Sequence, residues 1–312
     1  MPEKVDFLEK LRELKPRRVF IQVPEGLKTR VMELSREIED AGIRAYVSVE
    51  PCYGACDIRD REAKALGCDV ILHIGHSDYG VKTVLPVIYD EFRIDYDPVP
   101  LIKKNLTGLK KYRKIGLVTS VQYLSGLAKA GSFIREHGKK VLLGSPSRAR
   151  HPGQILGCDY SAAKSIEKGV DCFLFMGTGR FHPLGLAMEV EKPVLFLDYE
   201  SGKLEDLKQD RFSLQKLRFA QIAKAGEARR FGILVSTKPG QAHPGIAEQA
   251  KKRLEKLGRQ AWILVADRHT PEKLLGLRVE ALVNTACPRI REDASLFKKP
   301  IISVEDIDYL EE

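Results

Sequence analysis

Two kinds of segment alternate along the chain: short runs that are almost continuously apolar, and longer segments whose apolar residues recur every three or four positions. Continuous apolar runs are typical of strands buried on both faces of a parallel sheet, and the longer period is typical of amphipathic helices. Runs of the first kind, each ending in turn-forming or polar residues, occupy residues 17–26, 114–122 and 230–241. A helical segment that ends on a glycine follows each run, at residues 27–42, 122–138 and 243–258. The pattern therefore predicts three strand–helix units.

Three further strand-like runs follow each of these units. They lie at residues 44–50, 68–75 and 86–91, at residues 139–145, 170–179 and 192–200, and at residues 259–266, 279–287 and 299–306. Strands that alternate with amphipathic helices indicate an α/β fold with parallel sheets. We therefore predict three similar parallel-sheet α/β domains around a pseudo-threefold axis. Their expected extents are residues 1–104, 105–225 and 226–312.

Composition agrees with a protein that has a substantial core and does not enter the membrane. The chain has 312 residues, of which 43% are hydrophobic, and no apolar run approaches the roughly 18 residues of a membrane span. The charged beginning, residues 1–18, predicts a short amphipathic helix, since a signal peptide would need an apolar stretch and a cleavage site. We expect a cytoplasmic protein with no membrane partner.

The net charge of +9 is a weak indication of function. Basic proteins can bind nucleic acid or acidic partners, but the basic clusters lack interleaved aromatic residues and any RNA-binding signature. We expect a solvated basic surface and no direct nucleic-acid partner. The chain also lacks the GxSxG, HExxH and Walker motifs, which argues against a serine hydrolase, a zincin or a P-loop enzyme.

The six cysteines fall into two groups. Cys68 and Cys172 lie in apolar strands, where a free cysteine behaves as a small buried hydrophobe. The other four are next to glycine, proline or aspartate in predicted loops, where functional residues concentrate; they are Cys52, Cys56, Cys158 and Cys287. Six cysteines are too few for a disulfide scaffold, and a reducing cytoplasm would keep them as thiols.

One loop cysteine from each repeat follows a predicted strand: Cys56, Cys158 and Cys287. Ligands of open parallel sheets bind beyond the carboxyl ends of the strands, so repeats packed around one axis would bring these thiols together. Three thiolates can hold a 4Fe-4S cluster and leave one iron open to a substrate. Two alternatives remain: isolated, buried thiols, or a three-cysteine zinc site completed by His151 or His182. Cys52 and Cys56 resemble the start of a CxxxCxxC motif, but Arg59 stands at its third position.

Other strand ends carry candidate contacts to a nucleotide or sulfonium cofactor. These are Gln22, Glu25, Gly26, Gly177, Gly179, Gly240 and Gln241. Glycine lets a ligand approach the backbone closely, but polar strand-end residues serve as helix caps just as often. His73 and His76 bracket another strand end and are equally open to a structural or a functional interpretation.

Six segments together resemble the archaeal diphthamide synthases, which catalyse the first step of diphthamide formation. The segments are QVPEGL, PCYGACDIRDREA, HIGHSDYG, ILGCDYSAA, STKPGQ and NTACPRIRED, and the resemblance covers essentially the whole chain. It implies a homodimeric, atypical radical S-adenosylmethionine enzyme with three α/β domains per subunit. It also implies a 4Fe-4S cluster on Cys56, Cys158 and Cys287, with no ligand role for Cys52.

The implied reaction transfers the 3-amino-3-carboxypropyl group of S-adenosylmethionine to C2 of a histidine of translation elongation factor 2. An unidentified electron donor would reduce the cluster. No acid–base catalytic residue is predicted, because in such chemistry the protein supplies binding, orientation and electrostatics. The closest alternatives are a quinolinate-synthase-like 4Fe-4S dehydratase and a non-enzymatic, metal-containing RNA-associated module.

Overall fold

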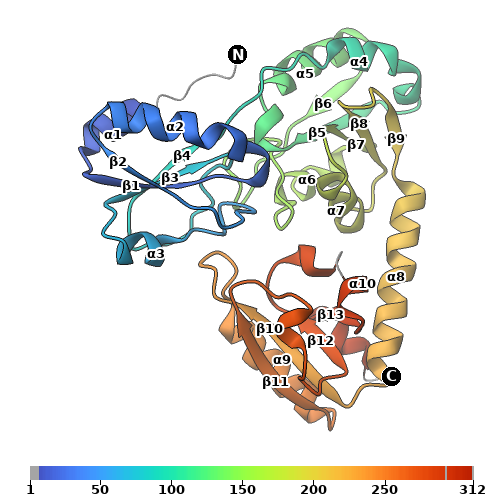
Figure 1. Cartoon of the computed structure of the whole chain (residues 1–312). Helices are drawn as coiled ribbons and strands as arrows, with labels where there is room; N and C mark the ends of the chain where they lie inside the picture. Colours follow the sequence, from blue (N-terminus) through green and yellow to red (C-terminus); the bar gives the residue numbers. More distant parts are fainter. Residues whose placement is uncertain (1–6, 292–293, 311–312) are drawn as a thin grey trace. The chain divides into compact units, whose positions relative to one another are not determined.

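Three mostly parallel sheets organise the protein in the computed structural model, which describes residues 7–291 and 294–310 (Figure 1). The chain divides into two compact units, residues 1–209 and 210–312. The first unit contains two of the sheets, and the second unit contains the third. We describe each unit by itself.

The first sheet has the strand order β2-β1-β3-β4, with all neighbours parallel. Its strands are β1 (Arg18–Gln22), β2 (Arg44–Val47), β3 (Val70–Ile74) and β4 (Val87–Asp90). Helices α1 (Phe7–Leu14) and α2 (Lys28–Asp40) cover one face, and α3 (Asp60–Ala65) covers the other. Alternate β1 side chains serve the two faces: Val19 packs towards α1 and α2, and Phe20 packs towards α3. The register pairs Gln22 with His73 at the carboxyl edge.

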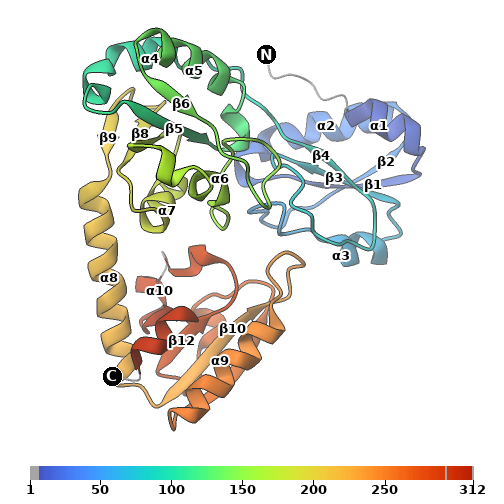
Figure 2. The same cartoon turned by 180° about the vertical axis from the view of Figure 1, so that it is seen from behind.

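The second sheet repeats this order as β6-β5-β7-β8 and adds β9 in antiparallel orientation (Figure 2). Its strands are β5 (Lys114–Thr119), β6 (Lys140–Leu142), β7 (Cys172–Gly177), β8 (Val194–Asp198) and β9 (Leu204–Asp206). Helices α4 (Val99–Lys104) and α5 (Gly126–Glu136) cover one face, and α6 (Ser161–Lys164) and α7 (Phe181–Glu189) cover the other.

The second unit contains the third sheet, in the order β11-β10-β12-β13. Its strands are β10 (Arg230–Ser236), β11 (Gln260–Ala266), β12 (Ala281–Asn284) and β13 (Ile301–Ser303). The helices are α8 (Lys208–Gly226), which begins at the end of the first unit, α9 (Pro244–Lys256) and α10 (Ala294–Phe297). Short 3-10 helices complete the described chain at Glu25–Leu27, Leu106–Leu109, Val121–Tyr123, Glu167–Gly169, Glu272–Leu274, Pro288–Arg291 and Glu305–Leu310.

The predicted α/β class is confirmed, because mostly parallel strands alternate with helices along the chain. The three sheets also share one strand order, in which the second strand lies at the edge and is followed by the first, third and fourth strands. The pseudo-threefold axis and the domain boundaries near residues 104 and 225 stay predictions. The N-terminal helix is present over Phe7–Leu14, and residues 1–6 lie outside the described part. No helix in the described residues is both long and apolar enough to cross a membrane.

The two strand cysteines are buried, as predicted. Cys172 lies in β7 with no exposed surface, and Cys68 packs beneath α3. Burial raises the pKa of Cys172 to about 12 and also raises the pKa of Cys68. Because a thiolate is the form that binds metals and reacts, both thiols are inert core groups.

Candidate metal centre

The loop that contains Cys56 is held by a buried glutamine of β1. Gln22 is 1% exposed, and its side-chain Nε2 donates to the carbonyl oxygen of Asp57 at 3.1 Å. Its Oε1 accepts a hydrogen bond from the backbone N–H of Arg59 at 3.0 Å. The N–H of Asp57 donates to the Gly54 carbonyl at 2.9 Å, which closes a tight turn around Cys56. The amide of Gln22 therefore fixes the position of Cys56 relative to the first sheet.

We expect Gln22→Leu to lower the free energy of unfolding, because it leaves the Asp57 carbonyl and the Arg59 N–H without their buried partner. Each orphaned group costs about 1–3 kcal/mol, so the denaturant midpoint should fall clearly. Glu25→Ala is the matched control, since Glu25 is exposed and forms only a surface ion pair with Lys28 at 2.7 Å. If the unfolding curve of Gln22→Leu coincides with that of Glu25→Ala, the Gln22 amide does not stabilise the loop that contains Cys56.

Tyr79 connects the first sheet to the cysteine of the second. It lies in the loop after β3, is 6% exposed, and its hydroxyl is 3.3 Å from Cys158 Sγ. The Arg148 guanidinium stacks over its ring at 4.1 Å from the centroid. Burial, then the contact with Cys158 and the charge of Cys56, raise the pKa of Tyr79. Cys56 and Cys158 therefore both influence the ionisation of Tyr79.

The long loop that presents Cys158 is held by the neighbouring carboxylate. Asp159 is buried, and its Oδ2 accepts from the backbone N–H groups of Arg148 at 3.0 Å and Ala149 at 2.9 Å. Its Oδ1 accepts from the N–H of Ser161 at 3.0 Å. Burial works against the charge, but hydrogen bonds from Ser161, Ala149 and Arg148 outweigh it and lower the pKa of Asp159. Cys158 itself stays exposed.

Cys287 belongs to the second unit and follows β12. The side chain of Asn284 shapes its turn: Nδ2 donates to the Cys287 carbonyl at 2.9 Å, and Oδ1 accepts from the Ala286 N–H at 3.0 Å. The hydroxyl of Thr285 donates to the Leu234 carbonyl of β10 at 2.7 Å, which ties the turn to the sheet. Cys287 is half-buried at the carboxyl end of its sheet, the location that the sequence predicts.

The other cofactor candidates of the first unit lie at the carboxyl ends of β1 and β7. Glu25 and Gly26 are exposed in the short helix after β1. Gly177 ends β7 with φ +156°, and Gly179 has φ +73° with no atom within 4 Å of an added Cβ. The Thr178 hydroxyl between them lies 3.1 Å from that of Tyr123. Gly179 therefore leaves the backbone after β7 open to close approach, whereas an added Cβ at the buried Gly177 would lie 3.2 Å from Tyr123.

The remaining candidates have local partners. Gly240 and Gln241 lie in the turn after β10 in the second unit, where the N–H of Gln241 donates to the Lys238 carbonyl at 2.9 Å. His151 pairs with Glu91 at 2.6 Å, and the ring of His182 stacks on Phe175 with centroids 6.2 Å apart. The two histidines proposed as zinc ligands therefore have other neighbours in the first unit.

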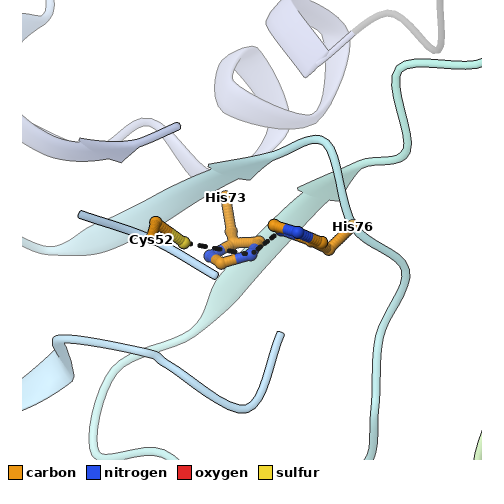
Figure 3. A group of neighbouring side chains, drawn as sticks. All are labelled: Cys52, His73 and His76. Atoms are coloured by element: carbon orange, nitrogen blue, oxygen red, sulfur yellow. Dashed lines mark hydrogen bonds between the residues drawn. The ribbon is translucent and has the colours of Figure 1, made fainter. Parts of the chain in front are cut away.

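A separate cluster of possible metal ligands is formed by Cys52, His73 and His76 (Figure 3). The sequence alone did not indicate that these three side chains lie together. Cys52 Sγ lies 3.9 Å from His73 Nε2, and the same nitrogen lies 3.0 Å from His76 Nδ1. Burial and the neighbouring His76 lower the pKa of His73 well below its usual value. Burial and then His182 lower the pKa of His76 to about 4. Both imidazoles are therefore neutral at pH 7.

The three loop cysteines fit an iron–sulfur cluster by their chemistry. Cluster irons take thiolate ligands, and hydrogen bonds to the sulfurs tune the cluster. Cys56 follows a strand of the first sheet and Cys158 follows a strand of the second, and the Tyr79 hydroxyl, 3.3 Å from Cys158 Sγ, can donate to a thiolate. The first unit can therefore supply two ligands and a hydrogen-bond donor to one centre.

Comparisons with known proteins show the family to which the chain belongs. Residues 23–310 match the family described as diphthamide synthesis protein. A 2-(3-amino-3-carboxypropyl)histidine synthase of Pyrococcus horikoshii is 38% identical over 98% of this chain and 89% of its own. One of Methanocaldococcus jannaschii is 29% identical over 96% of this chain and 85% of its own. The crystal structure of Dph2 from P. horikoshii with a 4Fe-4S cluster matches with a TM-score of 0.92 and 38% identity, over 99% of this chain and 90% of that one.

Proposed function

Because the chain belongs to the diphthamide synthesis protein family, we propose that it is a 2-(3-amino-3-carboxypropyl)histidine synthase. The proposed substrates are S-adenosylmethionine and a histidine of translation elongation factor 2. The bond from the sulfonium sulfur to the 3-amino-3-carboxypropyl group breaks, and that carbon bonds to C2 of the imidazole. The products are methylthioadenosine, the modified histidine and the C2 proton, so the net reaction needs neither an oxidant nor a reductant.

The observation that carries this proposal is the contact between the Tyr79 hydroxyl, in the loop after β3, and Cys158 Sγ at 3.3 Å, in a chain that matches this family. We propose that Cys287 of the second unit completes a three-thiolate site for a 4Fe-4S cluster. When bound, the cluster would supply the electron that starts C–S cleavage, after an external donor has reduced it, and that electron would return to the cluster when the C2 proton leaves. The chain's own residues hold the ligand loops: Gln22 holds the Cys56 loop, and Asn284 shapes the Cys287 turn.

S-adenosylmethionine is proposed to bind at the carboxyl strand ends. Gly179 supports this proposal most directly, because no atom lies within 4 Å of an added Cβ there and a ligand can approach the backbone. Gly177 is proposed to contribute at the end of β7. Glu25 and Gly26 offer a charged, exposed neighbour at the end of β1. Gly240 and Gln241 of the second unit are proposed as further contacts to S-adenosylmethionine. The amide of Gln22 is engaged with the loop backbone, so its proposed contribution to the cofactor is through that loop.

The proposed partners follow from the substrate. A translation factor places the enzyme in the cytoplasm, together with an electron donor. We further propose a homodimer, because the edge strand β11 exposes the apolar side chains of Trp262 (45%) and Val265 (63%). Unpaired apolar edges are uncommon on monomers. Light scattering of the holoprotein should give twice the mass of one chain.

The small-molecule products test the proposed reaction. The anaerobic, reduced holoprotein with S-adenosylmethionine and elongation factor 2 should release methylthioadenosine. Release of deoxyadenosine would mean that a different C–S bond breaks. Quinolinate formation from its precursors without S-adenosylmethionine would favour the dehydratase. A colourless protein with tight, salt-dependent RNA binding would favour the binding module.

A further inference from the structure

The cluster of Cys52, His73 and His76 has a local cause in the fold (Figure 3). Cys52 lies in the loop after β2, and His73 lies within β3, on the other side of β1. His76 follows Gly75, whose φ of +90° turns the chain back so that the two imidazoles meet. A Cβ at Gly75 would lie 2.9 Å from Pro24 Cγ, so the turn requires glycine. The arrangement is therefore built into the end of the first sheet.

The spacing of the three ligand atoms is close to that of a tetrahedral metal site. Zinc binds sulfur at about 2.3 Å and imidazole nitrogen at about 2.0–2.1 Å, which separates S and N ligands by about 3.5 Å and two N ligands by about 3.4 Å. The observed separations are 3.9 Å from Cys52 Sγ to His73 Nε2 and 3.0 Å from that nitrogen to His76 Nδ1. All three ligand atoms lie within 4.8 Å of one another. The first two separations differ from the tetrahedral values by about 0.4 Å and the third by at most about 1.3 Å, so side-chain shifts of up to about 1 Å would bring the three atoms onto one ion.

Hydrogen bonding is the competing account of this arrangement, since the Cys52 thiol can also donate to the Gly54 carbonyl oxygen at 4.0 Å. His73 Nε2 faces a thiol on one side and an imidazole nitrogen on the other. One N–H, or one lone pair, can serve only one of them well. A metal ion would instead use one lone pair from each of the three atoms. Cys52 and His73 are 3% and 0% exposed, whereas His76 is half-buried.

We propose that Cys52, His73 and His76 bind one divalent transition-metal ion of the zinc type, at a site separate from the three-thiol centre. One sulfur and two imidazole nitrogens are the donor set of zinc and its neighbours, and not of Mg²⁺ or Ca²⁺. Neutral imidazole is the form that binds a metal. Three protein ligands leave the fourth position for water or a small ligand, as in catalytic zinc sites. The site goes beyond the proposed transfer reaction and does not depend on it.

Cobalt(II) tests the site, because it replaces zinc and reports thiolate ligation by its absorption. The anaerobic, cluster-loaded full chain should bind one Co²⁺ per chain, with a thiolate-to-cobalt charge-transfer band and tetrahedral ligand-field bands. One equivalent of Zn²⁺ should displace it. Cys52→Ala should remove the charge-transfer band, and His76→Gln should weaken Co²⁺ binding by at least about 10–100-fold, the effect of losing even an outer-shell partner.

Cys172→Ala is the matched control, since it removes a buried thiol from another sheet and should leave Co²⁺ binding unchanged. Iron content and circular dichroism of each variant show that it is folded and cluster-loaded, so this test is independent of transfer activity. The proposal is overturned if wild-type protein shows no charge-transfer band, or if the band persists in Cys52→Ala. It is also overturned if Cys52→Ala loses iron as Cys56→Ala does, because Cys52 would then be a cluster ligand.

Discussion

Alanine at Cys56, Cys158 or Cys287 is expected to remove most of the iron and to reduce aminocarboxypropyl transfer by at least about 10³-fold. The reason is that the three thiolates are proposed to act as one ligand set, and removing one member of such a set costs nearly as much as removing all. Iron and sulfide analysis and the visible spectrum of anaerobically reconstituted variants measure the loss. Cys287 is the most informative of the three, since it comes from the other unit.

Cys68→Ala and Cys172→Ala are the controls for this series. Both thiols are buried in the sheets, and burial raises the pKa of each. We expect these variants to keep their cluster and activity and to lose only about 1 kcal/mol of stability from the small cavity. Equal iron loss in all five variants would contradict the assignment of ligands.

Gly144→Ala is expected to have the largest effect on stability. Gly144 lies at the start of the loop that presents Cys158, and a Cβ there would lie 1.8 Å from the carbonyl oxygen of Ala162. A backbone carbonyl in α6 cannot move aside as a flexible side chain can. Overpacking costs about 1–3 kcal/mol where side chains can yield, so we expect at least the upper end of that range. Denaturant unfolding measures it, and iron content should fall as the Cys158 loop shifts.

Gly245→Ala is the matched control for this substitution. Gly245 lies in the first turn of α9, and no atom lies within 4 Å of an added Cβ. Alanine in a helix is favoured over glycine by up to about 1 kcal/mol, so this variant should be as stable as wild type or slightly more stable. If Gly144→Ala unfolds at the same denaturant concentration as Gly245→Ala, the contact with Ala162 does not constrain the loop.

The repeated strands could be predicted because each is an apolar run buried on both faces, such as β7 (Cys172–Gly177). Strand β9 (Leu204–Asp206) and helix α8 (Lys208–Gly226) were not predicted. Strand β9 is too short to show a period. Helix α8 has no continuous apolar stripe, since Phe212 and Phe219 are exposed and its buried residues lie near its end. Periodicity reports burial, so elements with little burial escape it.

The candidate ligands of the site could be predicted from the sequence, but the residues that contact and position their loops could not. A cysteine next to glycine, proline or aspartate at the end of a strand marked Cys56, Cys158 and Cys287. The partners of Gln22 and Tyr79 lie 35 and 79 residues away in sequence, so only the folded chain brings them together. The cluster of Cys52, His73 and His76 joins two strand ends on either side of β1 in the same way. This cluster could be found only once the order of the strands in the first sheet was known.

The most direct test of the account is peptide mass spectrometry of elongation factor 2 after anaerobic incubation with the reduced holoprotein and S-adenosylmethionine. We predict that one histidine peptide gains the mass of a 3-amino-3-carboxypropyl group, that fragmentation places the gain on the histidine residue, and that methylthioadenosine appears in equal amount. Omission of the reductant, or Cys287→Ala, should abolish the gain. An unmodified factor in the presence of a fully loaded, reduced cluster would contradict the proposed function.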